Sequence, residues 1–215
     1  MKREEAYLYM RDRIIDRTWD VGKSISVNDV CAMLGMSRTP VQEALTRLEQ
    51  QGYVSITPQV GAFVRRPASE EVFERLLTRA ALEAVTAEWA ALRITAKQLD
   101  AIEAILGQME QSGLTSHEYA NLNREFHRTI HLASGLSYVQ RLVEQHWDYL
   151  EYAAETDQLF MDGQIKRSLA EHRMIFHGLK DGNGALTKQL MENHMVRVAH
   201  HLKRQNELTE NIDNS

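Results

Sequence analysis

The chain has 215 residues, enough for one large domain or two small ones with a substantial buried core. It has 25 Lys and Arg residues and 30 Asp and Glu residues, which gives a formal net charge of -5. This charge excludes a nucleic-acid-binding protein that is basic over its whole surface, but not a small DNA-binding domain in an otherwise acidic protein. The single cysteine, Cys31, excludes a disulfide framework. No apolar run approaches the ~20 residues of a membrane span, so we expect a cytoplasmic protein without a membrane partner.

The composition of the chain changes near Pro67. All three prolines lie at or before this residue, and all nine histidines lie at or after His117. The Ser-Glu-Glu segment that follows two residues later is typical of a helix start. We predict a mainly α protein with two domains, over residues 1–67 and 69–208, and a polar tail over 209–215.

The first domain has the predicted element order of a winged helix. An amphipathic helix is expected over residues 4–17, and a short second helix begins at Ser26 and ends at Gly35. A tight connection leads into a third helix that ends at Gly52, and residues 53–65 predict a two-stranded hairpin. Helix, helix-turn-helix and hairpin in this order make up a winged helix.

Polar side chains gather at the start of the third predicted helix. Arg38 and Gln42 are four residues apart and share one helix face. In a helix-turn-helix such residues meet base edges, where arginine suits guanine and glutamine suits adenine. The alternative is that Arg38 is solvated and its neighbours only cap the helix; Arg47 is a weaker candidate because Glu43 lies one turn away. The candidate DNA contacts are Ser37, Arg38, Thr39, Gln42, Arg47 and, on the wing, Arg65.

The second domain is predicted to be an all-helical antiparallel bundle of about six helices, because proline and strand-like alternation are both absent. The expected helices cover approximately residues 69–93, 95–111, 116–135, 137–160, 164–180 and 185–206. The apolar stripe expected on the first of them comprises Val72, Leu76, Ala80, Leu82, Val85, Trp89 and Leu92.

Three histidines and an asparagine in this domain have a spacing compatible with metal ligands. Asn123 and His127 are four residues apart on one predicted helix, and His172 and His194 fall on two later helices that a bundle can bring together. Neutral imidazoles with an amide or carboxylate oxygen suit Zn, Ni, Cu, Fe or Mn. The alternative is that these are surface or hydrogen-bonded core histidines, and the spacing alone leaves both interpretations open.

The helix-turn-helix resembles that of a known family. The segment Leu34-Gly-Met-Ser-Arg-Thr-Pro-Val-Gln-Glu-Ala-Leu-Thr-Arg-Leu-Glu49, followed by Gly52-Tyr-Val and Gly61-Ala-Phe-Val64, is similar to the DNA-binding domain of the GntR superfamily of bacterial transcription regulators. The resemblance implies binding to double-stranded DNA and adds Gly61, on the wing, to the candidate contacts. The family usually has arginine where this chain has Gln42, which favours adenine over guanine at one operator position.

The helical domain resembles the FCD ligand-binding domain of the FadR-like branch of this superfamily. Leu122-Asn-Arg-Glu-Phe-His127, Glu171-His-Arg173 and Asn193-His194 are similar to its three histidine-bearing segments. The resemblance implies a divalent metal, zinc or else nickel, manganese or iron, which binds a small carboxylate effector. The ligands it implies are Asn123, His127, His172 and His194. Because the neutral Asn123 stands where the family more often has aspartate, we expect either a lower metal affinity or a site completed by three imidazoles and water.

Two further residues are predicted to contact the effector. Arg79 resembles an arginine of the family's first bundle helix, although an ion pair with Glu83, four residues later, explains it equally well. His131, one turn after His127, is expected to line the cavity beyond the metal.

The predicted function is a DNA-binding transcription regulator whose operator affinity depends on a carboxylate metabolite at the metal site. One winged helix contacts few base pairs, so we expect a homodimer on a palindromic operator, as repressor or activator. One alternative is a regulator that senses the metal ion itself. Another is a metal-dependent enzyme with a winged helix, but the sequence has no HExxH, glycine-rich phosphate loop or Gly-x-Ser-x-Gly motif.

Overall fold

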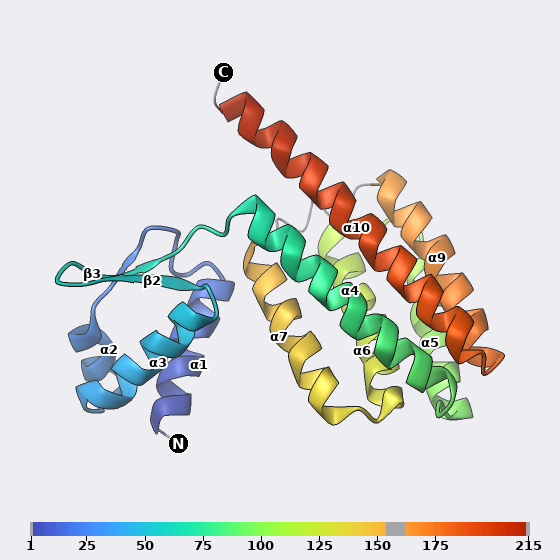
Figure 1. Ribbon diagram of the computed structural model, residues 1–215, viewed down its shortest axis with the longest axis horizontal. Coiled ribbons are helices and arrows are strands. Elements are labelled where there is room, and N and C mark those ends of the chain that lie inside the picture. The colour runs from blue at the N-terminus through green and yellow to red at the C-terminus, as the bar shows by residue number, and fades with distance from the viewer. Residues whose placement is uncertain (1, 154–161, 214–215) are drawn as a thin grey trace. The chain divides into compact units, whose positions relative to one another are not determined.

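The computed structural model describes residues 2–153 and 162–213, in which nine helices and one small sheet are formed. The chain divides into two compact units. The first comprises Met1–Ala68 and Asp148–Ala153, and the second comprises the remainder of the described chain. The predicted class, a winged helix-turn-helix followed by an all-helical bundle, is confirmed (Figure 1).

The first unit combines three helices with a small antiparallel sheet. Its elements are α1 (Lys2–Ile15), β1 (Ser24–Ile25), α2 (Val27–Leu34), α3 (Arg38–Gln50), β2 (Val54–Thr57) and β3 (Gly61–Val64). The core consists of apolar side chains at helical spacing on α1 and α3, among them Met10, Ile14, Val41, Leu45 and Leu48, all buried.

The turn between α2 and α3 is set by the residues at the two ends of α2. The Ser26 hydroxyl accepts a hydrogen bond from the Asp29 backbone N–H at 3.3 Å and so caps the start of the helix. Gly35 ends it with φ +60°, a left-handed conformation that glycine adopts without steric cost. The chain therefore reverses tightly, and α3 begins at Arg38 as the helix-turn-helix pattern predicts.

The wing has three strands rather than the predicted two. The strand order is β1-β3-β2, and Ser24 and Ile25 pair antiparallel with Phe63 and Ala62. A strand of two residues is too short to show alternation, so sequence periodicity could not reveal β1.

Six described helices form the second unit. They are α4 (Ser69–Ala91), α5 (Ala96–Met109), α6 (Ser116–Ser134), α7 (Ser137–Ala153), α9 (Asp162–Lys180) and α10 (Gly184–Asp213). Capping boxes at Thr95 and Thr115 start α5 and α6, and Gly135 ends α6 with φ +69°. The last turns of α7 are grouped with the first unit.

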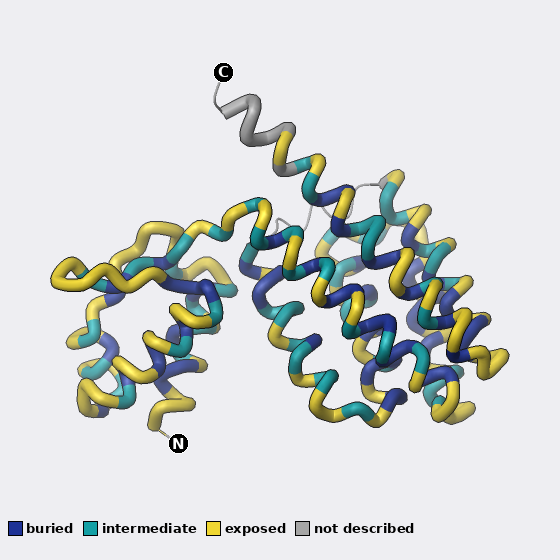
Figure 2. Tube along the Cα trace, viewed as in Figure 1, coloured by how far each residue is buried: buried dark blue, intermediate teal, exposed yellow. Residues whose placement is uncertain are grey.

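The bundle core forms where α4, α5, α6, α9 and α10 pack together, and buried segments alternate with exposed ones along these helices (Figure 2). The helix α10 packs along α4 and also against α9. At Gly178 on α9, a Cβ atom would lie 2.6 Å from the hydroxyl of Thr187 on α10. Glycine therefore permits the close approach of these two helices, which carry His172 and His194.

The predicted apolar stripe of α4 is wrong in its second half. Trp89 and Leu92 are 41% and 62% exposed, whereas Arg79 and Glu83 are 4% and 0% exposed. The prediction assumed that charged side chains face water. Arg79 and Glu83 are buried instead because they form an ion pair with each other inside the bundle.

Two helix ends also differ from the prediction. The last helix continues to Asp213 instead of ending near Asn206, so most of the predicted polar tail is helical. The segment after Asn206 is polar but lacks glycine and proline, so nothing in it breaks a helix. The helix predicted over 137–160 is observed as far as Ala153, and its predicted end, with residues 214 and 215 of the tail, lies outside the described residues.

Candidate metal centre and nucleic-acid interface

Three buried histidines from three helices converge at one point in the bundle. His127 on α6, His172 on α9 and His194 on α10 each offer a ring nitrogen, and these atoms lie within 4.8 Å of one another. The side chains are at most 3% exposed, and the Nε2 atoms of His172 and His194 are 3.2 Å apart. The structure thus brings together the three histidines that the sequence singled out.

The ring of His194 is oriented by a carboxylate and an arginine. Its Nδ1 lies 2.7 Å from an oxygen of Glu171, and because a carboxylate only accepts, Nδ1 carries the proton and donates it. Arg197 donates to both oxygens of Glu171 at 2.6 Å. With Nδ1 occupied in this way, Nε2 is left as the unprotonated atom that can bind a metal.

The ring of His127 is oriented in the same manner. Its Nδ1 donates to Glu83 of α4 at 2.5 Å, and Arg79 donates to the other oxygen of Glu83. Trp147 of α7 covers this arginine, with the guanidinium carbon 3.4 Å from the indole centroid. We refer to Arg79–Glu83–His127 and Arg197–Glu171–His194 as the two relays. Carboxylates that hold metal-binding histidines in this way are typical of metal centres.

Two clusters of possible donor atoms lie in this part of the bundle, and the distances within them differ. Two nitrogens bound to a tetrahedral Zn²⁺ at 2.0–2.1 Å lie about 3.3 Å apart. The Nε2 atoms of His172 and His194 are 3.2 Å apart, a separation that suits either a shared zinc ion or a direct hydrogen bond between the rings. A second cluster, of Glu83, His127 and His131, also has its donor atoms within 4.8 Å. At 2.5 Å, however, Glu83 and His127 are too close to hold an ion between them. The donor set of the first cluster therefore fits a metal, and that of the second fits hydrogen bonding.

Burial keeps these histidines in the neutral form that binds metals. It lowers the pKa of His127 to about 4 despite the opposing charge of Glu83, and it also lowers the pKa of His194 and, far below its usual range, that of His172. Burial alone raises the pKa of Glu83, but Arg79 and the histidines outweigh it and hold the pKa well below its usual range. The centre therefore presents neutral imidazoles beside an ionised carboxylate at neutral pH.

The remaining predicted ligand and effector residues are also buried. Asn123 lies one turn before His127 on α6 and is 8% exposed. His131 is 1% exposed, and neither of its ring nitrogens has a hydrogen-bond partner among the described residues, although Nε2 lies 3.2 Å from Glu83. Arg79 forms the ion pair with Glu83, and its Nη2 donates only weakly, to the Met195 sulfur at 4.0 Å.

The residues that orient the three histidines were not predicted from the sequence. Glu83 was considered only as an ion-pair partner of Arg79, and Glu171, Arg197 and Trp147 were given no role at the site. The available signals were the Glu171-His172 adjacency and the three-residue spacing from His194 to Arg197, which places both on one face of α10.

The start of α3 presents exposed polar side chains, as a DNA-reading helix requires. Ser37, Arg38, Thr39 and Gln42 are all exposed, while Val41, Ala44, Leu45 and Leu48 face the core. The Ser37 side chain makes no capping hydrogen bond, so its hydroxyl is not used in starting the helix. These residues share the first turns of one helix, where HTH proteins contact base edges.

The three other predicted DNA contacts differ in their environment. Arg47 donates to Glu4 at 2.7 Å, and its guanidinium lies 3.5 Å from the centroid of the Tyr7 ring, so it is held by α1. Gly61 follows the wing turn with φ +144°, a conformation that favours glycine. Arg65 follows β3 and is half-buried.

Comparison with protein families agrees with this geometry over most of the chain. Residues 2–64 match the family of bacterial regulatory proteins, gntR family, and residues 74–197 match the FCD domain. The chain belongs to the GntR family, with an FCD domain. It is therefore a DNA-binding transcription regulator and not an enzyme. Regulators of this family bind operators and usually act as dimers, and FCD domains often bind metal.

Individual relatives extend over nearly the whole chain. An HTH-type regulator from an unstable DNA locus of Streptomyces ambofaciens is 26% identical over 94% of this chain and 85% of its own length. The Uxu operon transcriptional regulator of Escherichia coli is 27% identical, over 93% and 86% of the two chains. Among solved structures, E. coli McbR/YncC superposes with a TM-score of 0.67 at 20% identity, over 96% and 99% of the two chains. Among the described residues, no helix combines the length and apolar character needed to cross a membrane.

Proposed function

We propose that this GntR regulator changes its operator affinity when a small carboxylate binds at a divalent metal in its FCD domain. In this proposal residues 1–67 bind the operator, and residues 69–208 bind the metal and effector and form a homodimer. The convergence of three buried imidazole nitrogens, two of them oriented by the relays, is the observation that supports it most directly.

Zinc is the proposed metal, and His127, His172 and His194 are its proposed ligands. The separation of the two Nε2 atoms suits tetrahedral zinc, and the neutral imidazoles need lose no proton to bind it. Asn123, on the same face of α6 as His127, is the proposed oxygen ligand. When bound, the ion would supply a positive charge that attracts a carboxylate; nickel, manganese and iron are alternatives with the same ligands.

Arg79 and His131 are the proposed protein contacts of the effector. Arg79 brings a buried positive charge whose Nη2 contacts the Met195 sulfur at 4.0 Å. Within residues 2–153 and 162–213, the ring nitrogens of His131 form no hydrogen bond, although its Nε2 lies 3.2 Å from Glu83. An incoming carboxylate can accept from both, which would compensate for its loss of water. The effector must also bind one arrangement of the dimer better than another, or it cannot alter operator affinity.

The operator contacts proposed for each subunit come from the exposed start of α3 and from the wing. They are Ser37, Arg38, Thr39, Gln42, Gly61 and Arg65. Arg47 is left out because Glu4 and Tyr7 already hold it. Two such subunits on a palindromic site would double the number of bases read.

The metal part of this proposal is tested by calorimetric titration of zinc into the metal-stripped protein. We expect one site per chain, lost in His194→Ala and kept in the control His177→Ala, which changes an exposed histidine of α9. Equal zinc binding by both variants would contradict the site.

The effector part is tested by operator mobility shifts with the zinc-loaded protein and a panel of small carboxylates. We expect one class of carboxylate to change operator affinity only when zinc is present. A response to zinc alone, with no effect of any carboxylate, would instead favour the metal sensor.

A further inference from the structure

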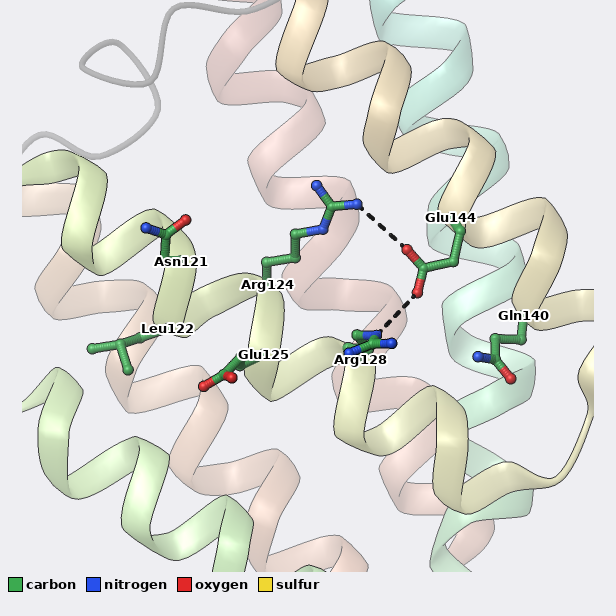
Figure 3. Close-up of a pocket in the computed structure, with 7 residues that line it drawn as sticks. All are labelled: Asn121, Leu122, Arg124, Glu125, Arg128, Gln140 and Glu144. Carbon is green, nitrogen blue, oxygen red and sulfur yellow. Dashed lines mark hydrogen bonds and ion pairs between the residues drawn. The ribbon is translucent and has the colours of Figure 1, made fainter. Parts of the chain in front are cut away.

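An open depression lies between α6 and α7 on the surface of the bundle. Its volume is about 760 Å³, within the range of small-molecule sites. It is lined by Asn121, Leu122, Arg124, Glu125, Arg128, Gln140 and Glu144, six of which are polar or charged (Figure 3). None of these residues belongs to the metal centre or to the proposed effector contacts described above.

One carboxylate in this depression is shared by two arginines. Glu144 of α7 points toward Arg124 and Arg128, which come from successive turns of α6, and each arginine pairs with a different oxygen (Figure 3). Glu125 points away from these pairs. Two guanidiniums that meet one planar carboxylate are arranged as arginines are when they bind a carboxylate ligand.

The ion pairs that the two arginines form with Glu144 are long. The N–O distances are 3.5 Å to Arg124 and 3.6 Å to Arg128, whereas the surface pairs Arg173–Glu110 and Lys188–Glu88 have distances of 2.6 and 2.8 Å. Charge-assisted hydrogen bonds are strong near 2.7–2.9 Å and weaken at longer range. The Arg128 side chain is also 60% exposed, so a ligand can reach it without any movement of the helices.

The depression is close to the buried centre. The Arg124 guanidinium lies 5.8 Å from the ring of Trp147, and the same ring stacks on Arg79 of the first relay. Arg124 and Glu144 are also among the charges that act on Arg79. A change of partner at Arg124 therefore alters the surroundings of both Trp147 and Arg79.

We propose that the α6–α7 depression is a second carboxylate-binding site, in which Arg124 and Arg128 exchange Glu144 for the carboxylate of a small ligand. Without a ligand, the carboxylate of Glu144 pairs with both arginines in the position that the ligand carboxylate would take. The site goes beyond the proposed function because it needs no metal. Its neighbour Trp147 reports its occupation.

The test uses succinate as the probe and the metal-stripped full-length chain with Trp19→Phe and Trp89→Phe, so that Trp147 is the remaining tryptophan. Succinate is expected to change Trp147 emission saturably, at an ionic strength held constant with sodium chloride. Arg128→Gln should weaken binding about tenfold, since one charge-assisted contact is lost. Glu144→Gln should tighten it several-fold, because the competing charge is removed. Calorimetry of the same substitutions in the chain with all its tryptophans provides a second measurement.

Arg141→Gln is the matched control, because it removes an exposed arginine of α7 that does not line the depression. It should bind succinate as the parent chain does. The proposal is overturned if Glu144→Gln weakens binding or leaves it unchanged, or if Arg128→Gln has no effect. Tighter binding of inorganic phosphate than of succinate would overturn the carboxylate assignment. Because all measurements are made without metal, failure here is distinguishable from failure of the zinc site.

Discussion

The two units of this regulator place the polar side chains proposed to act in binding in opposite environments. In the first, Arg38 and Gln42 are exposed at the start of α3, and an apolar core holds the helix from behind. In the second, Arg79 and Glu83 are buried in the bundle together with the histidines that they help to orient. The proposed DNA contacts of the first unit are thus separate from the residues that fold it, whereas the proposed metal and effector residues of the second unit are part of its core.

This difference determines what a substitution does in each unit. An exposed side chain contributes little to stability, and its removal changes mainly what the surface binds. A buried charge that loses its partner carries its full desolvation cost, so the fold is weakened along with the site. Under the proposed function, we therefore expect folding and ligand binding to be coupled in the bundle, and folding and DNA recognition to be separable in the winged helix.

The largest expected effect comes from breaking the first relay. Glu83→Ala leaves Arg79 buried without its carboxylate, and we expect a loss of about 3–5 kcal/mol in the free energy of unfolding. Urea denaturation of the metal-stripped chain, followed by circular dichroism, measures this change. Glu88→Ala is the control on the same helix, since it removes a partly exposed pair with Lys188 and should cost at most about 1 kcal/mol. Equal losses for both variants would show that burial does not distinguish the pairs.

Acid should destabilise the metal-stripped bundle for a related reason. The pKa of His127 is about 4 in the folded chain, against about 6.5 when unfolded, so the unfolded chain binds more protons between these values. The free energy of unfolding should therefore fall as pH drops from about 6.5 to 4, by about 3 kcal/mol from this residue alone. Urea titrations at a series of pH values measure the slope. His127→Gln should flatten the slope and His177→Gln should not, and a slope of the opposite sign would refute the buried neutral ring.

A smaller effect is expected from the second relay, because Glu171 is only half-buried. Glu171→Gln removes the charge that holds Nδ1–H of His194, and zinc affinity should fall about 10–100-fold. Calorimetry gives this ratio, with Glu110→Gln, which changes a surface pair with Arg173, as the control. An unchanged zinc affinity would show that Glu171 pairs with Arg197 but does not contribute to zinc binding through His194.

The fold could be predicted from the sequence because its signals are local. Ser26, Thr95 and Thr115 cap the helices that follow them, and Gly35 and Gly135 end two of these helices in left-handed conformations. Each of these signals depends on neighbours within four residues. The elements that sequence analysis missed, such as the strand β1, form only through pairing with distant residues.

The candidate site was predictable only in part, for the same reason. Spacing along α6 identified Asn123 and His127, but sequence alone does not show which histidines meet across helices. Glu83 was the hardest case, because a buried ion pair and a solvated one have the same four-residue spacing. Packing against α6 and α10 decides between them, and it turns Arg79 and Glu83 inward and Trp89 outward.

The smallest effect is expected from Gln42→Arg, which tests whether DNA recognition and stability depend on different residues in the first unit. Gln42 is exposed, and its backbone oxygen accepts from the Thr46 hydroxyl at 3.1 Å, a bond that does not involve its side chain, so the new side chain should leave α3 intact. Binding-site selection with both chains should return operators that differ at one position, adenine for Gln42 and guanine for arginine, a preference of about 1–3 kcal/mol. The urea midpoint and zinc affinity should stay the same, because nothing in the bundle depends on this side chain. The same consensus from both chains would remove Gln42 from the base contacts, and a loss of stability comparable to that of Glu83→Ala would show that recognition and folding are coupled here as well.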